Sequence, residues 1–556
     1  MMKKLLFLLS IASVQTLCAQ PLLSTATPQI TFGTTLETAT DSIQVTINNS
    51  GGTDVLISEF KFFSDTYSSQ PFSTNPSSLN VPAGSNARVW VRFKPTQNLP
   101  HNSELIAVNN SGRGALKIDL LGQGRYSNTY YSTTENLTGE ALRVALTTRT
   151  GQGFVPLTYA GARDQLFMSI DNQQVGGQNS VTCVYTGRVI TGWVDRTAAQ
   201  NLNFNTEHTF PQSMFNNGAE PMRSDIHHLF TVDETANSVR SNSPFIALTS
   251  WTWTSTQIPG YVLPLSKNGP GGFEPRDDHK GKGARGMLYF GMRYNGNAQV
   301  STSFLPSQEP LLMAWSKQFL PTAQEKLRNN RIFNTQGNRN PFIDYPQLLE
   351  RLKSVTTNAD LTPASIANKG ENQVQFNTVA VGSSAIYDYY VVNTGNANLP
   401  LSAMIISGAG ASSYQIVSTA NQIIAAGEAG KIQIKCQPTS TQPAVATLNY
   451  NAGNNAQQVP LLANGAVSTQ DFVNKFRLSV APNPVENMAN IKLPFDTQSL
   501  PVVHAYNALG QEVNIGYQAF GSNEIRLNTA YLPHGMYKVT IFFEAENAQC
   551  NATFIK

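Results

Sequence analysis

Glu207 and His208 are neighbours in the segment "FNTEHTFPQSMF", and two further histidines, His227 and His228, follow in "SDIHHLF". The whole chain of 556 residues holds only seven histidines, so three in one short segment are an unusual concentration. A neutral imidazole can remove a proton from water, and imidazole and carboxylate groups together can bind a metal ion. The cluster therefore predicts a metal site or a catalytic base, with simple side-chain packing as the alternative.

Two strands and a helix would bring these side chains together. "FNTEHTF" and "HHLFTV" have the composition of strands, and "TVDETANSVRSN" carries a helix start in which Thr231 and Glu234 form a capping box. The helix should end before Pro244, because a residue that precedes proline disfavours helical geometry. Asn237 and Arg240, three residues apart, then share one helix face. The expected order is a strand with Glu-His, a loop, a strand with His-His, and a helix with Asn and Arg.

This order is that of a ββα-metal unit, and the sequence around it resembles the bacterial endonuclease I family of secreted, sugar-nonspecific nucleases. Five segments carry the resemblance: "YTGR", "FNTEHTFPQSMF", "PMRSDIHHLF", "ETANSVRSNSPF" and "FEPRDDHKGKGARGMLYFGMRY". The resemblance implies that Glu207 and Asn237 hold one divalent cation, Mg²⁺ in the first place and Mn²⁺ or Ca²⁺ as alternatives. It also implies that His208 activates water as the general base and that the products carry 5′ phosphates.

The chain departs from the family pattern at several positions. The family's "NGRRSN" reads "NSVRSN" here, and a family Asp after "KG" is Lys282. The phosphate-binding arginine is either Arg223 or Arg240, and the sequence leaves that choice open. A second hypothesis follows from the altered motif, namely a surface adhesion protein whose nuclease-like domain is inactive. A zinc site is a third, although "HExxH" and a nearby Cys pair are both lacking.

Other charged residues near the cluster carry less specific expectations. Adjacent strand residues face opposite sides, so at most one of His227 and His228 should face the site. Asp225 would orient an imidazole from behind. A basic run on a predicted helix would either contact phosphates or face solvent; it comprises Lys280, Lys282, Arg285 and Arg293. We expect Glu274 and Arg285 to form a structural ion pair.

Around this region the sequence predicts a multidomain chain with a central α+β ββα-metal nuclease domain at 126–358. Helices are expected in "TGEALRVALTTRT", "TYAGARDQLFMSI", "GKGARGMLYFGMRY" and "LLMAWSKQFL", and a strand in "SVTCVYTGRVI". Two copies of another pattern flank it at 21–125 and 359–468, where "VPAGSNARVWVRFKP" corresponds to "IAAGEAGKIQIKCQP". Their period-two alternation resembles the immunoglobulin-like (Ig-like) β-sandwiches of bacterial "choice-of-anchor" modules. We expect them to be spacers.

The two ends of the chain indicate export. Residues 1–20, "MMKKLLFLLSIASVQTLCAQ", have the charged start and short apolar stretch of a signal peptide. At 469–556, "APNPVENMANIKL", "YNALGQEV" and "LPHGMY" resemble the C-terminal sorting domain of the type IX secretion system, a small β-sandwich. The protein should therefore be secreted or attached to the cell surface, with the type IX machinery as a partner. Nothing later in the chain is apolar for long enough to span a bilayer.

Composition narrows the partners further. The formal net charge of +3 is too small for a protein that coats nucleic acid, although a local basic surface remains compatible with it. Beyond the signal peptide only Cys183, Cys436 and Cys550 remain, far apart, so a disulfide framework is not expected. The expected partner is DNA, with RNA as a second substrate that the sequence leaves open. No specific protein partner is predicted.

Overall fold

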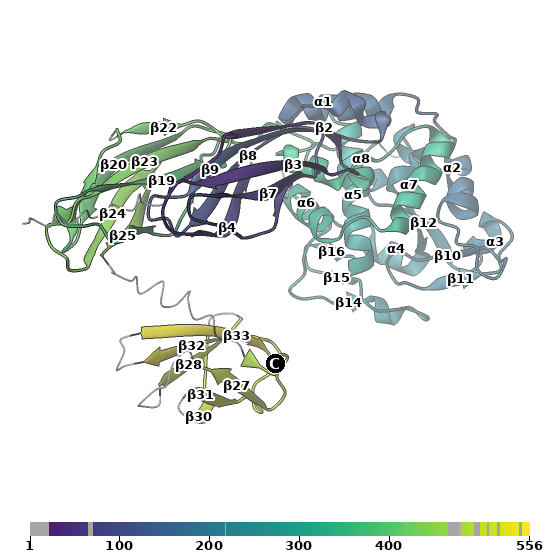
Figure 1. Cartoon of the computed structure of the whole chain (residues 1–556). Coiled ribbons are helices and arrows are strands. Elements are labelled where there is room, and N and C mark those ends of the chain that lie inside the picture. The colour runs from purple at the N-terminus through teal and green to yellow at the C-terminus, as the bar shows by residue number, and fades with distance from the viewer. Residues whose placement is uncertain are drawn as a thin grey trace, which may run out of the picture.

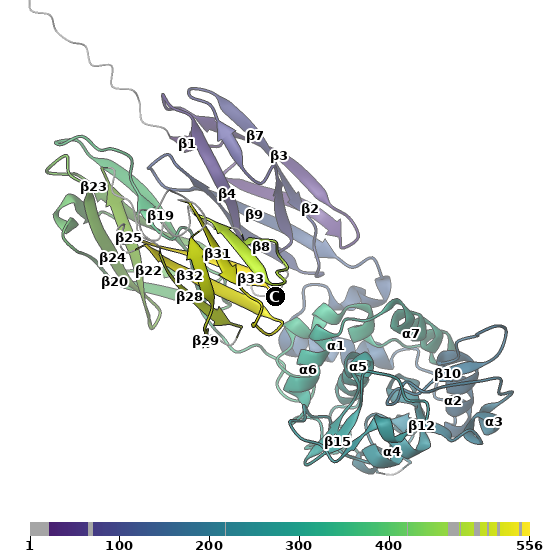
Figure 2. The same ribbon diagram turned by 90° about the horizontal axis from the view of Figure 1, so that it is seen from below.

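The computed structural model describes residues 22–64, 70–216, 218–419, 421–464, 478, 480–493, 501–508, 511–519, 523–543 and 548–556. The predicted signal peptide, residues 1–20, and the predicted boundary at 468 lie outside the described residues. The chain is multidomain: a helix-containing central region stands at one end of a β module, and a second β module lies beside the first (Figures 1 and 2).

The central region contains the predicted helices. They are α1 (Gly139–Gly151), α2 (Tyr159–Gln165), which continues as a π-helical turn (Leu166–Ile170), α5 (Asp277–Arg293) and α6 (Glu309–Gln318). The predicted strand in "SVTCVYTGRVI" is a short hairpin, β10 (Ser180–Thr182) and β11 (Val189–Thr191). The remaining elements are α3 (Arg196–Gln200), β14 (Trp253–Thr254), β15 (Lys267–Gly269), β16 (Gly272–Glu274), α7 (Ala323–Gln336) and α8 (Pro341–Asp344).

The ββα order is present, with two differences from the prediction. Strands β12 (Phe204–His208) and β13 (Leu229–Asp233) pair antiparallel, and α4 (Glu234–Arg240) follows directly. The helix ends before Pro244 as expected, but its cap is Asp233, whose carboxylate accepts from the backbone N–H groups of residues 235 and 236. Thr231 is not the cap, because it lies inside β13 and its hydroxyl is bonded to Asp171. The His-His pair forms a short 3-10 helix (Ile226–His228) rather than part of the strand.

Helix α5 is the structural centre of this region. Every residue from 283 to 292 is buried, so the helix is surrounded by the hairpin and by the other helices. Small residues make the close approach possible: a Cβ at Gly286 would lie 3.2 Å from the carbonyl oxygen of His227. The ββα hairpin therefore rests directly on the backbone of α5, which fixes its position.

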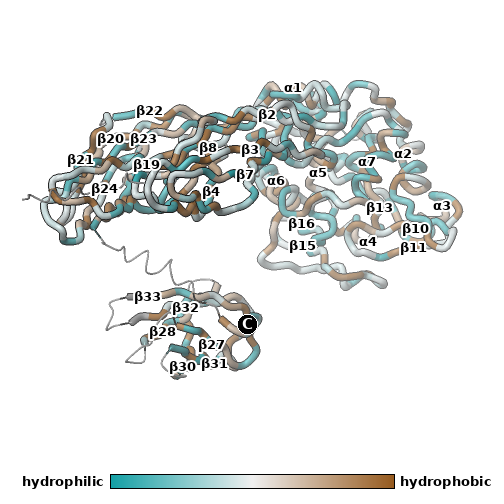
Figure 3. Tube along the Cα trace, viewed as in Figure 1, coloured by the Kyte–Doolittle hydropathy of each residue, from teal (hydrophilic) through white to brown (hydrophobic). Residues whose placement is uncertain are grey.

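The two flanking modules have the same strand order, so the repeat seen in the sequence is a structural repeat. Each has a four-stranded and a five-stranded sheet around its own core, ordered β1-β3-β7-β5 with β2-β9-β8-β4-β6, and β17-β19-β23-β21 with β18-β25-β24-β20-β22. A buried asparagine holds the turn of the repeated "N-x-G" motif in both: Asn49 accepts from the N–H of Gly51, and Asn393 from that of Gly395. In Figure 3, hydrophobic and hydrophilic residues are interleaved along these strands, as half-buried strands require.

The strand bounds of the first module are β1 (Leu23–Ser24), β2 (Gln29–Leu36), β3 (Asp41–Asn49), β4 (Val55–Ser64), β5 (Phe72–Asn75), β6 (Leu79–Val81), β7 (Asn86–Phe93), β8 (Pro100–Asn109) and β9 (Leu116–Arg125). Those of the second module are β17 (Ala367–Lys369), β18 (Val374–Gln375), β19 (Ala385–Asn393), β20 (Leu399–Ser407), β21 (Tyr414–Ile416), β22 (Gln422–Ile424), β23 (Ala429–Cys436), β24 (Ala444–Ala452) and β25 (Asn455–Ala463).

The first module is bonded to the central region through polar groups, both buried and at the surface. Arg351 is fully buried and donates through Nη1 to the side-chain oxygen of Asn98 at 2.6 Å. Glu37 accepts from the backbone N–H of Ser127 at 2.7 Å and from the hydroxyl of Tyr345 at 3.1 Å. The same module meets the second one, where the N–H of Asp388 donates to the carbonyl of residue 113. The first module is therefore joined to the central region and to the second module by specific hydrogen bonds and not only by flexible linkers.

The C-terminal strands form two four-stranded sheets around a separate hydrophobic core. They are β26 (Val480–Ala481), β27 (Met488–Lys492), β28 (Val502–Asn507), β29 (Glu512–Val513), β30 (Gly516–Ala519), β31 (Glu524–Asn528), β32 (Met536–Phe543) and β33 (Ala548–Ile555). Among the described residues, no helix is both long and apolar enough to cross a membrane. The three described cysteines, Cys183, Cys436 and Cys550, are buried and unpaired within that part of the chain.

Candidate active site

Glu207 is a buried carboxylate, only 1% exposed, at the end of β12. Its Oε1 accepts a hydrogen bond of 2.6 Å from the hydroxyl of Tyr185 and lies 3.1 Å from Nη1 of Arg240. Burial raises the pKa of this carboxyl group, while Arg240 and Tyr185 lower it. The other oxygen, Oε2, has no hydrogen-bond partner among the described residues, so it remains available for a ligand.

Arg240 supports this carboxylate and the backbone beside it. The guanidinium is 1% exposed and donates to the carbonyls of His208 at 3.1 Å and Thr209 at 2.6 Å, besides pairing with Glu207. Its donors are thus directed at the protein interior. Of the two arginines that the sequence leaves open for phosphate binding, Arg240 is held against Glu207, and contact with phosphate would leave that buried carboxylate unpaired.

The imidazole of His208 is held in a defined orientation. Its Nε2 lies 3.1 Å from the carbonyl oxygen of Arg223, and a carbonyl can only accept, so Nε2 carries the proton. Nδ1 is then the lone-pair nitrogen, and the side-chain amide of Gln212 donates to it at 3.2 Å. Burial holds the pKa of His208 well below its usual range, with the neighbouring His228 acting in the same direction. The ring is therefore neutral at neutral pH.

A cavity of about 320 Å³ opens over these groups. Its lining includes Glu207, His208, Gln212 and Asn237, which come from β12, the turn that follows it, and α4. The side-chain amide of Asn237 makes no hydrogen bond to the described residues, so its oxygen is available beside that of Glu207. A carboxylate and an amide oxygen on one wall match the oxygen ligands that a hard divalent cation prefers.

A basic and aromatic group borders His208 on its other side, and sequence reasoning missed most of it. The ring of Tyr159, from α2, lies 5.5 Å from the His208 ring, with the guanidinium of Arg223 4.0 Å above it. Arg163 stands 5.3 Å from the same ring and donates to Thr206 in β12. The signal was present in "TYAGARDQ", where an aromatic residue and an arginine are four apart and so share a helix face.

His227 and His228 point to different surroundings. The ring of His228 lies 5.4 Å from that of His208, and its Nε2 donates to the carbonyl of Met222 at 2.8 Å. His227 faces the core, where Nε2 donates to the carbonyl of Asn338 at 3.2 Å. Both are fully buried, and burial lowers the pKa of each to about 4.

Asp225 does not orient an imidazole, contrary to the prediction. One carboxylate oxygen accepts from the hydroxyls of Tyr289 and Tyr294, both at 2.9 Å, and the other from the amide of Gln336 and the backbone N–H of His227. The latter bond caps the 3-10 helix that contains the two histidines. Asp225 therefore positions the backbone of the His-His segment rather than a ring.

The basic run on α5 is mostly committed to structural pairs. Arg285 is 1% exposed and donates from Nε and Nη2 to the two oxygens of Glu325, each at 2.7 Å. It is therefore not available to phosphate, and it does not form the ion pair with Glu274 that we predicted. Glu274 instead pairs with Lys280 at 2.7 Å. Arg293, also on this run, lies 3.5 Å from the carboxylate of Asp225. The exception is Lys282, which makes no hydrogen bond or ion pair with the described part of the chain.

Comparison with known proteins identifies this central region. Residues 138–347 match the family described as Endonuclease I. An extracellular ribonuclease of Bacillus amyloliquefaciens is 30% identical over 249 residues, which are 41% of this chain and 78% of that protein. The chain belongs to the Endonuclease I family. It is a nuclease enzyme, and its substrate is nucleic acid.

Other relatives agree on the activity and the location. The extracellular ribonuclease of Bacillus subtilis (strain 168) is 28% identical over 271 residues, covering 45% of this chain and 88% of that protein. A periplasmic deoxyribonuclease of Aeromonas hydrophila is 29% identical over 123 residues, 22% of this chain and 48% of its own length. Residues 479–555 match the secretion system C-terminal sorting domain. This member of the Endonuclease I family is accordingly a secreted or cell-surface protein.

Proposed function

We propose that the protein is a metal-dependent, sequence-nonspecific endonuclease that hydrolyses phosphodiester bonds and leaves 5′ phosphates. The observation that carries the proposal is the fixed tautomer of His208: Nε2–H is bonded to a main-chain carbonyl, and Nδ1 carries the free electron pair. That residue lines the same cavity as Glu207 and Asn237. A base and two oxygen ligands thus share one space large enough for a phosphodiester group.

His208 would act as the general base. Its lowered pKa keeps the ring neutral and able to take a proton from water at Nδ1. The amide of Gln212, now 3.2 Å from Nδ1, would turn to the water and hold it in place. After proton transfer the imidazolium would keep its Nε2–H bond to the Arg223 carbonyl, so the ring would not need to move during the reaction.

Glu207 and Asn237 would hold the divalent cation, Mg²⁺ in the first place, with Mn²⁺ or Ca²⁺ as alternatives. The residues fit such an ion: Oε2 of Glu207 and the amide of Asn237 are both unbonded within the described structure and line one cavity. Among the described residues there is no group of three or more His, Cys, Asp or Glu arranged to hold a metal. When bound, the cation would stabilise negative charge on the phosphate and on the leaving 3′ oxygen.

Arg223 is the arginine that we assign to the phosphate. Its guanidinium is stacked 4.0 Å from the Tyr159 ring beside His208, whereas that of Arg240 is buried against Glu207. Stacking on an aromatic ring orients a guanidinium while leaving its edge free to bind two oxygens. Arg163, on the same ring, would extend the positive surface along the strand.

The proposed substrates are DNA and, as a second substrate, RNA. The relatives include both an extracellular ribonuclease and a periplasmic deoxyribonuclease. The residues assigned above recognise phosphate and metal rather than base edges, so cleavage should be nonspecific and sensitive to salt. Purified protein on matched DNA and RNA, with Mg²⁺ and with EDTA, tests this directly. Cleavage that continues in EDTA would refute the metal dependence.

A His208→Ala variant tests the base. It should cleave at least about 10²-fold more slowly, while Mg²⁺ affinity stays close to that of the wild type. Near-normal turnover would remove His208 from the mechanism. If the wild type does not nick plasmid DNA in the presence of Mg²⁺, the alternative is favoured, namely an adhesion protein with an inactive nuclease-like domain. The altered "NSVRSN" motif is what supports that alternative.

Asn237 variants test the second ligand. Asn237→Ala should lower activity at scarce Mg²⁺ and regain part of it in excess, because Glu207 and substrate phosphates still hold the ion. Asn237→Asp should perform better than Ala, since it keeps an oxygen at the same reach. If Ala cleaves at the wild-type rate in scarce Mg²⁺, Asn237 is not a ligand.

The proposed domains are the Ig-like modules at 21–125 and 359–468, the nuclease at 126–358 and the sorting domain at 469–556. The Ig-like assignment rests on the paired four- and five-stranded sheets of each module. The sorting domain would address the chain to the type IX machinery. A chain that ends at 468 should therefore cleave normally but remain inside the cell, and normal export of that truncation would refute the role.

A further inference from the structure

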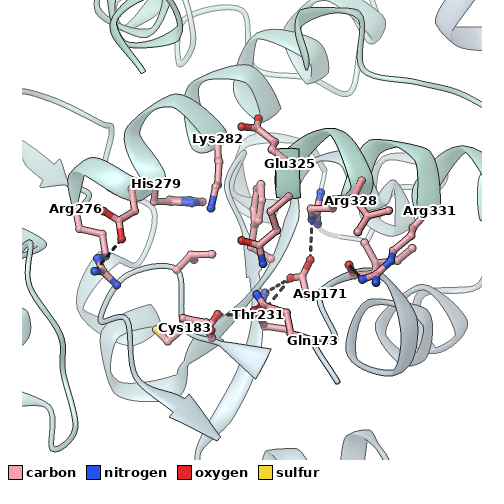
Figure 4. Close-up of a pocket in the computed structure, with 17 residues that line it drawn as sticks. Asp171, Gln173, Cys183, Thr231, Arg276, His279, Lys282, Glu325, Arg328 and Arg331 are labelled. Carbon is pink, nitrogen blue, oxygen red and sulfur yellow. Dashed lines mark hydrogen bonds and ion pairs between the residues drawn. The ribbon is translucent and has the colours of Figure 1, made fainter. Parts of the chain in front are cut away.

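A second pocket, of about 300 Å³, lies between α5, α7 and the start of β13 (Figure 4). It shares no lining residue with the cavity that contains Glu207 and His208. Its volume is at the lower end of the range for small-molecule sites. The nuclease chemistry proposed above uses none of its residues.

Two side chains in this pocket lack partners. Lys282, on α5, points into the pocket and makes no hydrogen bond or ion pair with the described residues (Figure 4). His279, one turn earlier, is 1% exposed, and neither of its ring nitrogens has a hydrogen-bond partner in the described structure. Both ring nitrogens of His279 are enclosed by the protein, so the accessible group that lacks a partner among the described residues of this pocket is the ammonium of Lys282.

The charges around the pocket favour an anion. The three carboxylates of its wall are each already bound to an arginine: Asp171 to Arg328 at 2.7 Å, Asp278 to Arg276 at 2.9 Å, and Glu325 to the buried Arg285 at 2.7 Å. Lys282 and Arg331 are additional cations on the same wall. Of these two, Arg331 is used to cap backbone carbonyls at the end of the π-helical turn. The free positive charge is therefore that of Lys282.

We propose that this pocket is a second phosphate-binding site, which takes a phosphate group either free or at the end of a nucleotide. The ammonium group of Lys282 would pair with the dianion. Lysine binds phosphate as a point charge. The apolar part of the wall, Ile170, Val184 and Leu327, offers a surface for a nucleoside.

Calorimetric titration of the full chain with inorganic phosphate, in EDTA and at constant ionic strength, tests the site. Lys282→Ala should weaken binding by about tenfold or more, the effect of losing one charge-assisted hydrogen bond. Lys280→Ala is the matched control, because Lys280 lies on the same helix but outside the pocket and is paired with Glu274. Its affinity for phosphate should equal that of the wild type.

A third variant separates this pocket from the nuclease cavity. Arg223→Ala should weaken phosphate binding at the nuclease cavity and leave the binding that depends on Lys282 in place; if it abolishes all binding while Lys282→Ala does not, the phosphate lies at the nuclease cavity and the proposal is wrong. Repeating the titration with 5′-dAMP distinguishes the two sources. Equal affinities indicate that free phosphate is sufficient, and tighter binding of 5′-dAMP indicates a nucleotide. Binding of neither ligand by the wild type would also overturn the proposal.

Discussion

Asn98 is the residue at which the dependence of the nuclease on its N-terminal module can be measured. It lies in that module, is 1% exposed, and accepts from the fully buried guanidinium of Arg351 in the central region at 2.6 Å. Its amide also donates to the hydroxyl of Thr134 at 3.0 Å. We predict that Asn98→Ala destabilises the nuclease, although neither the cavity nor any residue assigned to chemistry is touched.

The magnitude follows from what the substitution leaves behind. A hydrogen bond to a charged group contributes about 1.5–3 kcal/mol, and a buried partner left unbonded adds its own desolvation cost. Arg351 keeps its bonds to the carbonyls of Leu137 and Thr134, so its charge is not left wholly without partners. The free energy of unfolding should therefore fall by about 2–4 kcal/mol. For a body of this size that corresponds to a melting temperature lower by roughly 5–10 °C.

Two measurements compare the wild type with the variant: the melting temperature, and the nuclease activity that remains after heating. Asn80→Ala is the matched control, since Asn80 belongs to the same module but is exposed, and its side-chain amide donates to Asp54 at 3.2 Å. It should melt like the wild type. If Asn98→Ala keeps nuclease activity to the same temperature as Asn80→Ala, the module is the independent spacer that the sequence suggests, and the reasoning from Arg351 fails.

Three further predictions concern the buried charges. Tyr185→Phe removes the 2.6 Å bond to Glu207 and should lower cleavage at scarce Mg²⁺ by about tenfold, the worth of one such bond; an unchanged Mg²⁺ titration would contradict it. Arg285→Met leaves the carboxylate of Glu325 buried alone and should cost about 3–5 kcal/mol in urea unfolding, with cleavage per folded molecule unchanged. A double variant that also carries Glu325→Leu should recover most of that loss. The pKa of His227 is about 4 when folded and near 6.5 when unfolded, so only the unfolded chain takes up the proton in between. As pH drops from about 6.5 to 4, His227 alone should lower the free energy of unfolding by about 3 kcal/mol, and His227→Gln should remove that share of the slope in urea melts at several pH values.

Sequence reasoning predicted the placement of those candidate residues that depends on local order. Glu207 and His208 end one strand and Asn237 lies on the next helix, so a short ββα unit brings them to one cavity. It was not sufficient where two residues compete for one role. Asp233 rather than Thr231 caps α4, because a strand pairing that no local pattern reveals had already engaged the threonine.

Long-range burial explains the other differences. The cations of α5 look alike in the sequence, yet Arg285 faces a glutamate forty residues away, and among the described residues Lys282 finds no hydrogen-bond or ion-pair partner. Likewise Arg240 and Arg223 look alike in the sequence, and only the structure shows that Arg240 lies against Glu207. Period and composition place a charge on a helix, but which neighbour meets it depends on helices that are distant in the chain.

The hydrogen bond between Nε2 of His208 and the carbonyl of residue 223 has a consequence for how this enzyme can vary. The group that fixes the reactive tautomer belongs to the main chain, which every amino acid supplies alike. In the proposed mechanism, a substitution at position 223 would change substrate binding and leave the orientation of the His208 ring unchanged. In that mechanism, the side chain of residue 223 binds the substrate and its main-chain carbonyl orients His208. A change in substrate preference at this position therefore need not reduce catalysis.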